Sequence, residues 1–177
     1  MVETRKRMAV VVLAAVAAAV LAAAAGASTG TTSDVAAATS KFRNLAVAKK
    51  AGYGILRDKK GIACIAMDSM PGMGAMGVHY VKSAYVGDGK LEKNEPEALV
   101  YAPTNGKLRL AALEYVVLKS AWQAHHASAP SLFGHTFALT PAGNRFGLPA
   151  FYSLHVWLFA KNPAGTFTMW NPNVSCR

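Results

Sequence analysis

Cysteine and acidic residues are scarce in this 177-residue chain. Two cysteines are too few for a small domain held together by several disulfides, and the glycine and proline counts exclude a collagen-like repeat. A hydrophobic share of 53% excludes a wholly disordered chain. Nine acidic against 19 basic side chains leave a formal net charge of +10. No internal repeat with a fixed period is present, and we expect one domain.

Sequence motifs of common enzyme classes are also missing. No serine stands in a nucleophile elbow, and no phosphate-binding glycine loop precedes a predicted helix. The string GMGAMG at 72–77 has the dinucleotide-binding spacing, but a strand-like segment follows it where that motif needs a helix. For glycoside chemistry, Glu97 is the only candidate partner for a buried Glu114. We therefore assign no catalytic residue from the sequence, and whether the protein is an enzyme stays open.

The first 27 residues have the three parts of a secretory signal peptide. Three basic residues at 5–7 are followed by an apolar run at 8–25 and by small residues up to Ala27. We predict a Sec-type signal that is cleaved after Ala27, and a secreted or periplasmic protein. An uncleaved membrane anchor is the alternative, but more than half of the apolar run is alanine, which is weakly hydrophobic.

The mature chain predicted by this cleavage remains basic. Cleavage removes three basic and one acidic side chain, which leaves 150 residues with a formal charge of +8. This charge favours anionic surfaces such as cell-envelope polymers. The basic residues are scattered and are not interleaved with aromatics, which argues against nucleic-acid binding. We expect no nucleic-acid partner and no permanent membrane span after cleavage.

Both cysteines lie in the predicted exported part. Cys64 and Cys176 can form one intramolecular disulfide in an oxidising compartment, and this bridge would tie the C-terminus to the start of the fold. A pair of metal-binding thiolates is the alternative. The lack of cysteine or histidine near Cys176 makes it the poorer one.

The mature chain divides into a leader and one globular domain. Residues 28–39 are rich in Ser, Thr and Ala and are predicted to be a flexible leader, and 40–177 form the domain. A helix is predicted from Ser40, with glycines after it as stop signals. Asn105-Gly106 predicts a tight hairpin. Short β-rich segments follow the helix at 78–86, 98–102, 108–118, 136–139, 151–160 and 166–170.

These segments define an α+β fold class. We expect an N-terminal helix that packs on a bent, mainly antiparallel sheet, or on a partly closed small β-barrel. The turn sequence at 162–165 is predicted to join the last two strands.

Six short strings, in order, resemble a family of exported bacterial proteins without an assigned function. They are MGVHY at 76–80, PEALVY at 96–101, LEY at 113–115, APSLFG at 129–134, LHVW at 154–157 and NPNVSC at 171–176. The resemblance covers about residues 40 to 176. It implies export and a single domain, and it implies no particular activity.

Three predicted strands each carry one metal-binding side chain in apolar surroundings. Glu114 interrupts the even-numbered apolar stripe of strand 108–118, and a buried carboxylate needs a partner. His79 and His155 lie on apolar faces of two other strands. If they converge, two histidines and one carboxylate can bind Zn, Cu or Fe(II). The alternative is a hydrogen-bond network of Glu114 with an arginine, a tyrosine or a histidine that only fixes strand register.

Four methionines form a second candidate metal site. They recur at every third residue, and an extended polyproline-type segment would place them along one edge, where thioethers could bind Cu(I). The alternative is that they fill irregular gaps under a loop. The four are Met67, Met70, Met73 and Met76.

The remaining histidines are His125, His126 and His135, and we expect them to be exposed on both sides of a loop at 127–134. A lid formed by this loop over a pocket is the alternative.

Taken together, the sequence predicts an exported envelope-associated or secreted binding protein for a small ligand or a metal ion. A metal-dependent enzyme that uses His79, Glu114 and His155 is one alternative, and a purely structural surface protein is another.

Overall fold

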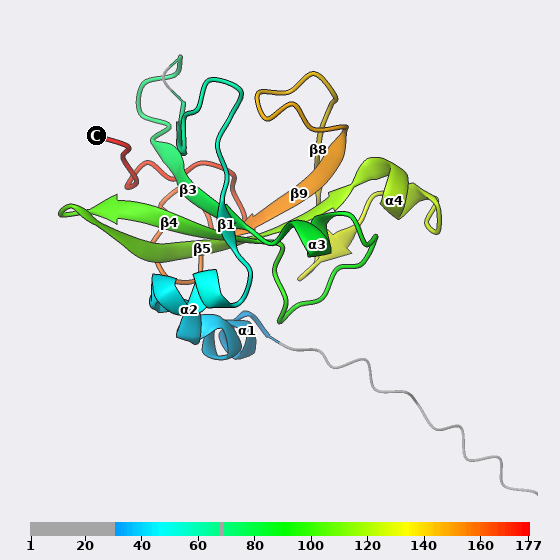
Figure 1. Cartoon of the computed structure of the whole chain (residues 1–177), viewed down its shortest axis with the longest axis horizontal. Helices are drawn as coiled ribbons and strands as arrows, with labels where there is room; N and C mark the ends of the chain where they lie inside the picture. Colours follow the sequence, from blue (N-terminus) through cyan, green and yellow to red (C-terminus); the bar gives the residue numbers. More distant parts are fainter. Residues whose placement is uncertain (1–30, 68) are drawn as a thin grey trace, which may run out of the picture.

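The structure, a computed structural model, describes residues 31–67 and 69–177 and has an α+β architecture built on one bent sheet (Figure 1). The helical elements are α1 (Thr32–Thr39), the 3-10 segment η1 (Ser40–Arg43), α2 (Leu45–Lys50), α3 (Ser83–Val86) and α4 (Lys119–Gln123). The first strands are β1 (Gly54–Ile55), β2 (Cys64–Ala66), β3 (Ala75–Val81), β4 (Ala98–Thr104) and β5 (Lys107–Leu118). The later strands are β6 (Ser131–Leu132), β7 (His135–Thr136), β8 (Ala138–Thr140) and β9 (Phe151–Val156).

The main sheet is antiparallel and open. Its strand order is β1-β3-β4-β5-β9-β8, with β2 paired to β3, and β6 and β7 form a separate small sheet. The Asn105-Gly106 prediction is confirmed: both residues have positive φ, 48° and 73°, in the two-residue turn that joins β4 to β5. β1 and β8 lie at opposite edges of the main sheet and do not pair, so the barrel alternative is wrong. The prediction of an N-terminal helix packed on a mainly antiparallel sheet is confirmed.

The two faces of the sheet have different coverings. On one side, α1 and α2 pack against a large core that contains Tyr101, Leu113 and Tyr115 (Figure 1). The other side carries a smaller cluster around Ala112 and Trp157, and mainly loops cover it in place of α1 and α2. This second side also carries the polar residues singled out from the sequence.

The predicted flexible leader is wrong from Thr32 onward, because Thr32–Thr39 is helix α1. Thr31 and Asp34 form a reciprocal capping box at its start, and Val35 is buried in the main core. The predicted helix from Ser40 is also interrupted: Asn44 caps a separate α2 by accepting from the N–H of Ala46. Local capping therefore divides one expected helix and orders part of the expected leader.

Three predicted strands end earlier or divide. The strand predicted at 78–86 is β3 followed by the short helix α3, and the one predicted at 136–139 is divided between β7 and β8. β9 ends at Val156, and the expected strand at 166–170 is a loop. Side-chain bonds hold that loop, since the Trp157 indole donates to the carbonyl of Thr168.

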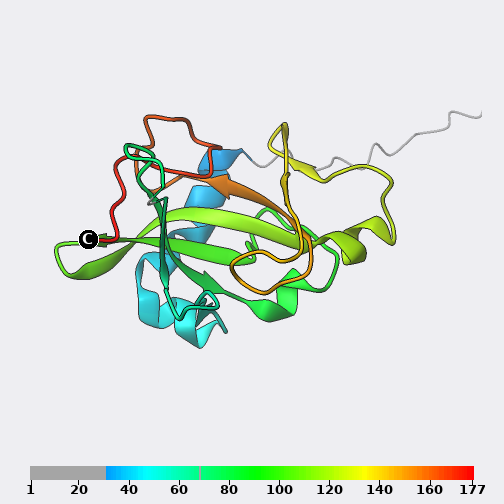
Figure 2. The same ribbon diagram turned by 90° about the horizontal axis from the view of Figure 1, so that it is seen from above.

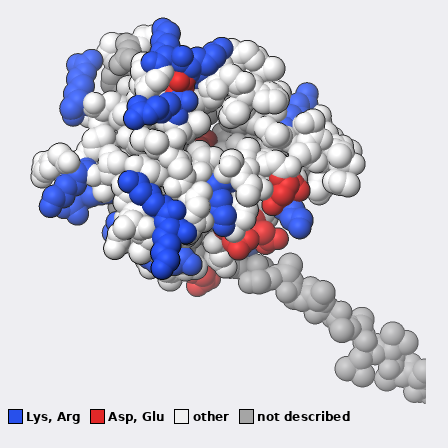
Figure 3. Space-filling view, viewed as in Figure 1, with Lys and Arg blue, Asp and Glu red and all other residues white. Residues whose placement is uncertain are grey.

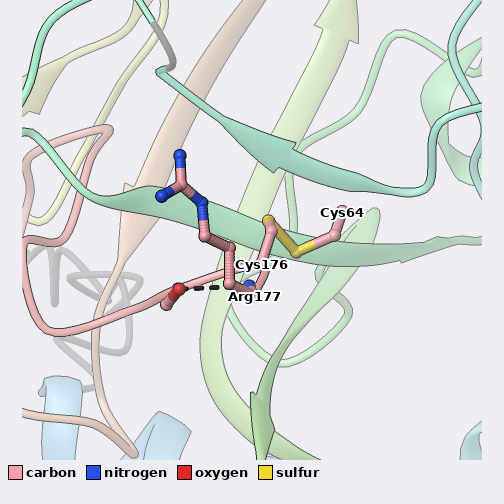
Figure 4. Close-up of a disulfide and its surroundings, with 4 residues drawn as sticks. Cys64, Cys176 and Arg177 are labelled. Atoms are coloured by element: carbon pink, nitrogen blue, oxygen red, sulfur yellow. Dashed lines mark hydrogen bonds between the residues drawn. A yellow bond between two sulfur atoms is a disulfide. The ribbon is translucent and has the colours of Figure 1, made fainter.

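The predicted disulfide between Cys64 and Cys176 is confirmed (Figure 4). The two cysteines are 112 positions apart in sequence, and their Cα atoms are 5.6 Å apart. Asn171 reinforces this connection through a bridge to Ala75, and Gly74 has no side chain that would collide with the Asn171 carbonyl. Figures 1 and 2 both place the C-terminus at the same end of the molecule as the β4–β5 turn.

The predicted signal peptide lies outside the described residues. Within 31–67 and 69–177, no helix has both the length and the apolar character needed to cross a membrane.

Candidate metal centre

The three candidate ligands lie on three strands of the main sheet, and the sheet register brings them together. Glu114 on β5 is directly opposite His155 on β9. β4 separates β5 from β3, and it places Ala98 opposite Glu114 and Val100 opposite His79. His79 and Glu114 therefore reach each other across β4, whose Ala98 and Val100 lie between their two strands.

A β-bulge at Ala111 determines which residues share the face of Glu114. The register shifts there, so Leu108 and Leu110 pack in or against the core on the helix side. After the bulge, Glu114 and Val116 point to the other side, into a pocket. The prediction that all even-numbered residues of this strand share one face is therefore wrong before the bulge and correct after it. One inserted residue exchanges the faces to which even- and odd-numbered side chains point.

The predicted ligands converge. His79, Glu114 and His155 offer one ligand atom each, all within 4.8 Å of one another. His79 Nε2 is 3.3 Å from His155 Nε2 and 3.4 Å from Glu114 Oε2. His155 Nδ1 is 3.5 Å from Glu114 Oε1. The three residues could therefore hold one metal ion.

These spacings fit metal ligation better than direct hydrogen bonding. A typical N–H···O bond measures about 2.7 to 3.2 Å, and both histidine–glutamate distances are longer. Two ligands bound at 2.0 to 2.1 Å to one tetrahedral ion lie about 3.3 to 3.4 Å apart. The two distances from His79 Nε2, 3.3 and 3.4 Å, match that separation.

Burial sets the protonation of the three groups. It lowers the pKa of His79 to about 4 and that of His155 to about 3, so both rings are neutral at pH 7. Burial also raises the pKa of Glu114, while His79 and the Ser153 hydroxyl act in the opposite direction. Neutral imidazole is the form that binds metals, and a bound ion would favour the carboxylate form of Glu114.

One ring nitrogen at the site is unsatisfied by hydrogen bonds of standard geometry. Among the described residues, the Nδ1 atom of His79 is the buried side-chain nitrogen or oxygen without such a partner. The backbone of Gly77 is nevertheless near enough to favour the protonated ring. With Nε2 bound to a metal, the ring proton would be on Nδ1 and would face this backbone group, as is usual for ligating histidines.

The three residues open into an apolar pocket. His79, Glu114 and His155, with Ser153, line one part of a cavity of about 660 Å³. Such a volume is typical of small-molecule sites, which span about 300 to 1,000 Å³. The rest of the lining is mainly apolar and includes Ile55, Val86, Val116, Leu148, Phe151 and Met169.

Two loops border this pocket, and an ion pair joins them. The segment after β1 and the segment before β9 both lie on the side of the sheet opposite α1 and α2 (Figure 1). Arg145 donates from Nη2 to Asp58 Oδ2 at 2.7 Å, and the N–H of Lys59 donates to the carbonyl of Arg145. The hydrogen bond from the Arg145 side chain to Asp58 is the largest of the causes that lower the pKa of the Asp58 carboxyl. The sequence pattern identified neither loop as part of the site.

The methionine prediction fails as a geometric arrangement. The N–H of Met70 donates to the carbonyl of Met67, and that of Met73 donates to the carbonyl of Met70. The segment therefore folds in successive turns, whereas a polyproline helix has no internal hydrogen bonds. Met70 and Met73 are exposed, and only Met76 of the four lines the pocket, together with Met169, which the sequence analysis did not single out.

The other three histidines are exposed, as predicted. His126 stacks on Trp122 with ring centroids 3.7 Å apart, and His135 stacks on Phe167 at 3.8 Å. Residues 127–134 do not line the pocket of the three ligands and form no lid over it, although Leu132 lines a separate cavity.

Basic residues are scattered on the face of the molecule shown in Figure 3. Figure 3 shows lysines and arginines in several separate groups over this face, with acidic side chains gathered mainly on one side. Asp34, Asp88, Glu92 and Glu95 line a second cavity, of about 870 Å³, together with two lysines.

Glu97, the candidate partner of Glu114 for glycoside chemistry, is buried. Its Oε2 accepts a hydrogen bond of 2.9 Å from the N–H of Val116, and burial raises its pKa to about 8. It lines the second cavity and not the pocket of the three ligands. Its position just before a strand was visible in the sequence, but its burial depends on the packing around it.

The raised pKa of Glu97 predicts a pH-dependent stability difference. The folded protein holds this proton more tightly than the unfolded chain between about pH 4.5 and 8, so the contribution of Glu97 to stability falls as the pH rises through that window. We expect Glu97→Gln to gain stability relative to wild type across it, by up to about 1.4 kcal/mol per pH unit. Urea unfolding at several pH values measures this, and a constant difference would contradict it.

No protein-family model, no curated protein and no solved structure matches this chain. The assignment of the site therefore depends on its own geometry.

Proposed function

We propose that this is an exported metal-binding protein in which His79, Glu114 and His155 hold one divalent transition-metal ion. The observation that carries the proposal is the pair of 3.3 and 3.4 Å distances from His79 Nε2 to His155 Nε2 and Glu114 Oε2. Both distances match the separation of two ligands on one tetrahedral ion, and the three residues offer ligand atoms that all lie within 4.8 Å of one another.

A polar network that only fixes strand register explains the site less well. Such a network stabilises a buried carboxylate through short hydrogen bonds. Glu114 has contacts of 3.4 and 3.5 Å to the two histidines, and the His79–His155 contact is 3.3 Å. The three residues are thus close enough for a shared ion, and their contacts with one another are too long for strong direct bonds. The Ser153 hydroxyl is a further hydrogen-bond partner of Glu114.

The ligand set indicates the class of metal. Two imidazoles and one carboxylate suit Zn²⁺, Fe²⁺ and Cu²⁺, whereas Ca²⁺ and Mg²⁺ prefer oxygen ligands. Met70 and Met73 are exposed, which argues against an extension of this site that binds copper through methionines. Three protein ligands leave a fourth position free on a tetrahedral ion, and the pocket lies beside them.

The pocket supports a metal-dependent enzyme as a second candidate function. An ion with an exchangeable position can bind and activate water, and a cavity of about 660 Å³ beside it can hold a substrate. Under this proposal, the three ligands are the residues required for catalysis.

Export is part of the proposal and is supported by two features. The first 27 residues have the pattern of a signal peptide, and the disulfide suits an oxidising compartment. The formal charge of +8 on the mature chain favours contact with anionic envelope polymers.

Elemental analysis of protein purified from its exported fraction tests the proposal. We expect about one transition-metal ion per wild-type chain, and less than about a tenth of that in His79→Ala and His155→Ala. His126→Ala, which removes an exposed histidine, is the control and should keep the wild-type content. If wild-type protein contains no metal after dialysis against Zn²⁺, the proposal is wrong and the three residues have a structural role.

A further inference from the structure

The pocket beside the three ligands combines one polar end with mainly apolar walls. The candidate ligands His79, Glu114 and His155 form one polar cluster with Ser153, and the other polar lining residues are Ser83, Thr140, Asn144 and Arg145. The Asn144 side chain is already hydrogen-bonded within its own loop. Along β5 and β9 the lining continues from Glu114 and His155 to Val116 and then to Leu118 and Phe151, and Val86 and Leu148 add apolar surface. A ligand that fills this cavity therefore needs an apolar body and a single polar head.

The charge around the pocket determines which charge the head group of the ligand should carry. A divalent ion bound by two neutral histidines and the Glu114 carboxylate carries a net charge of +1. Arg145 also lines the pocket, but Asp58 neutralises it through the 2.7 Å ion pair. An uncompensated charge in apolar surroundings is costly, so a head with one negative charge completes the site better than a neutral group or a dianion.

We propose that the pocket binds apolar monoanions whose head group, a carboxylate or a group of similar charge, occupies the free position of the metal. This inference depends on the metal site of the proposed function. It adds the ligand class, which the metal site by itself does not specify.

Calorimetric titration of the Zn²⁺-loaded and the metal-free full chain with decanoate tests the proposal. We expect the loaded protein to bind decanoate at least about tenfold more tightly than decanol and about 100-fold more tightly than acetate, because only decanoate supplies both head and body. Removing the metal should weaken decanoate binding by at least about tenfold. Equal binding of decanoate and decanol, or equal binding with and without metal, would overturn the proposal.

A variant with a filled pocket provides a second test. Val86 lines the pocket, and we expect Val86→Trp to weaken decanoate binding at least about tenfold while Zn²⁺ binding is retained. Val47→Trp is the matched control, since Val47 is 39% exposed on α2, on the opposite side of the sheet. Unchanged decanoate binding in Val86→Trp would contradict the assigned position of the ligand.

Failure of the proposed ligand class can be distinguished from failure of the proposed metal site. If the chain binds one Zn²⁺ but does not distinguish decanoate from decanol, the ligand class is wrong and the metal site stands. If Zn²⁺ itself does not bind, the proposed function fails, and the ligand class fails with it.

Discussion

Replacing Glu114 with glutamine is expected to weaken Zn²⁺ binding by more than about 100-fold, because even outer-shell partners of metal ligands contribute 10- to 100-fold. Glutamine has nearly the same shape but cannot supply the negative charge that a divalent ion needs. At a free Zn²⁺ concentration 1,000 times the wild-type dissociation constant, wild-type protein should gain about 4 kcal/mol of stability, and Glu114→Gln should gain less than about 1.4 kcal/mol. Chemical unfolding with and without Zn²⁺ measures both quantities.

The metal-free form of the same variant separates metal ligation from a structural network. If Glu114 only stabilised the fold through ion pairs with the histidines, its loss would cost about 3 to 5 kcal/mol. The long contacts of 3.4 and 3.5 Å predict a much smaller change, within about 1 kcal/mol. Glu97→Gln is the matched control, because it replaces another buried acid, outside the pocket, and should leave Zn²⁺ binding unchanged.

Removal of the disulfide is expected to have the second large effect, on stability. Cys64 and Cys176 are 112 positions apart, and in the chain-entropy model a loop of this size stabilises the fold by about 4 to 5 kcal/mol. We expect the double variant Cys64→Ala/Cys176→Ala to lose about this amount of unfolding free energy. Urea unfolding of the wild type under oxidising and reducing conditions should show the same difference.

The metal site provides an internal control for the disulfide experiment. The bridge joins β2 to the C-terminal segment, whereas the three ligands lie on β3, β5 and β9. The double cysteine variant should therefore still bind one Zn²⁺ under conditions in which it is folded. A loss of less than about 1 kcal/mol would contradict the account, because it would show that the long loop is already constrained in the unfolded chain.

The ligand trio could be predicted from the sequence because strand alternation is a local property. One polar residue in an apolar stripe, as at Glu114, indicates burial and the need for a partner. The Asn105-Gly106 turn was predictable for the same reason, since positive φ at two successive positions has a clear sequence signature. Both features depend on only a few neighbouring residues.

The pocket could not be predicted, since its walls come from segments far apart in the sequence. The loop around Arg145 contributes to the site because of its ion pair with Asp58, and no local pattern indicates that pairing. The bulge at Ala111 also escaped prediction, because one extra residue leaves the composition of the strand unchanged. The methionine spacing was misleading, since turns around Pro71 replace the extended backbone it required.

The most direct test of the metal site is a crystal structure of the mature protein grown with Zn²⁺, with anomalous scattering measured at the zinc edge. The account predicts one ion at about 2.0 to 2.2 Å from His79 Nε2, His155 Nε2 and a Glu114 carboxylate oxygen, with its remaining position toward the pocket. An empty trio at saturating Zn²⁺, or zinc bound only at the exposed histidines, would contradict it.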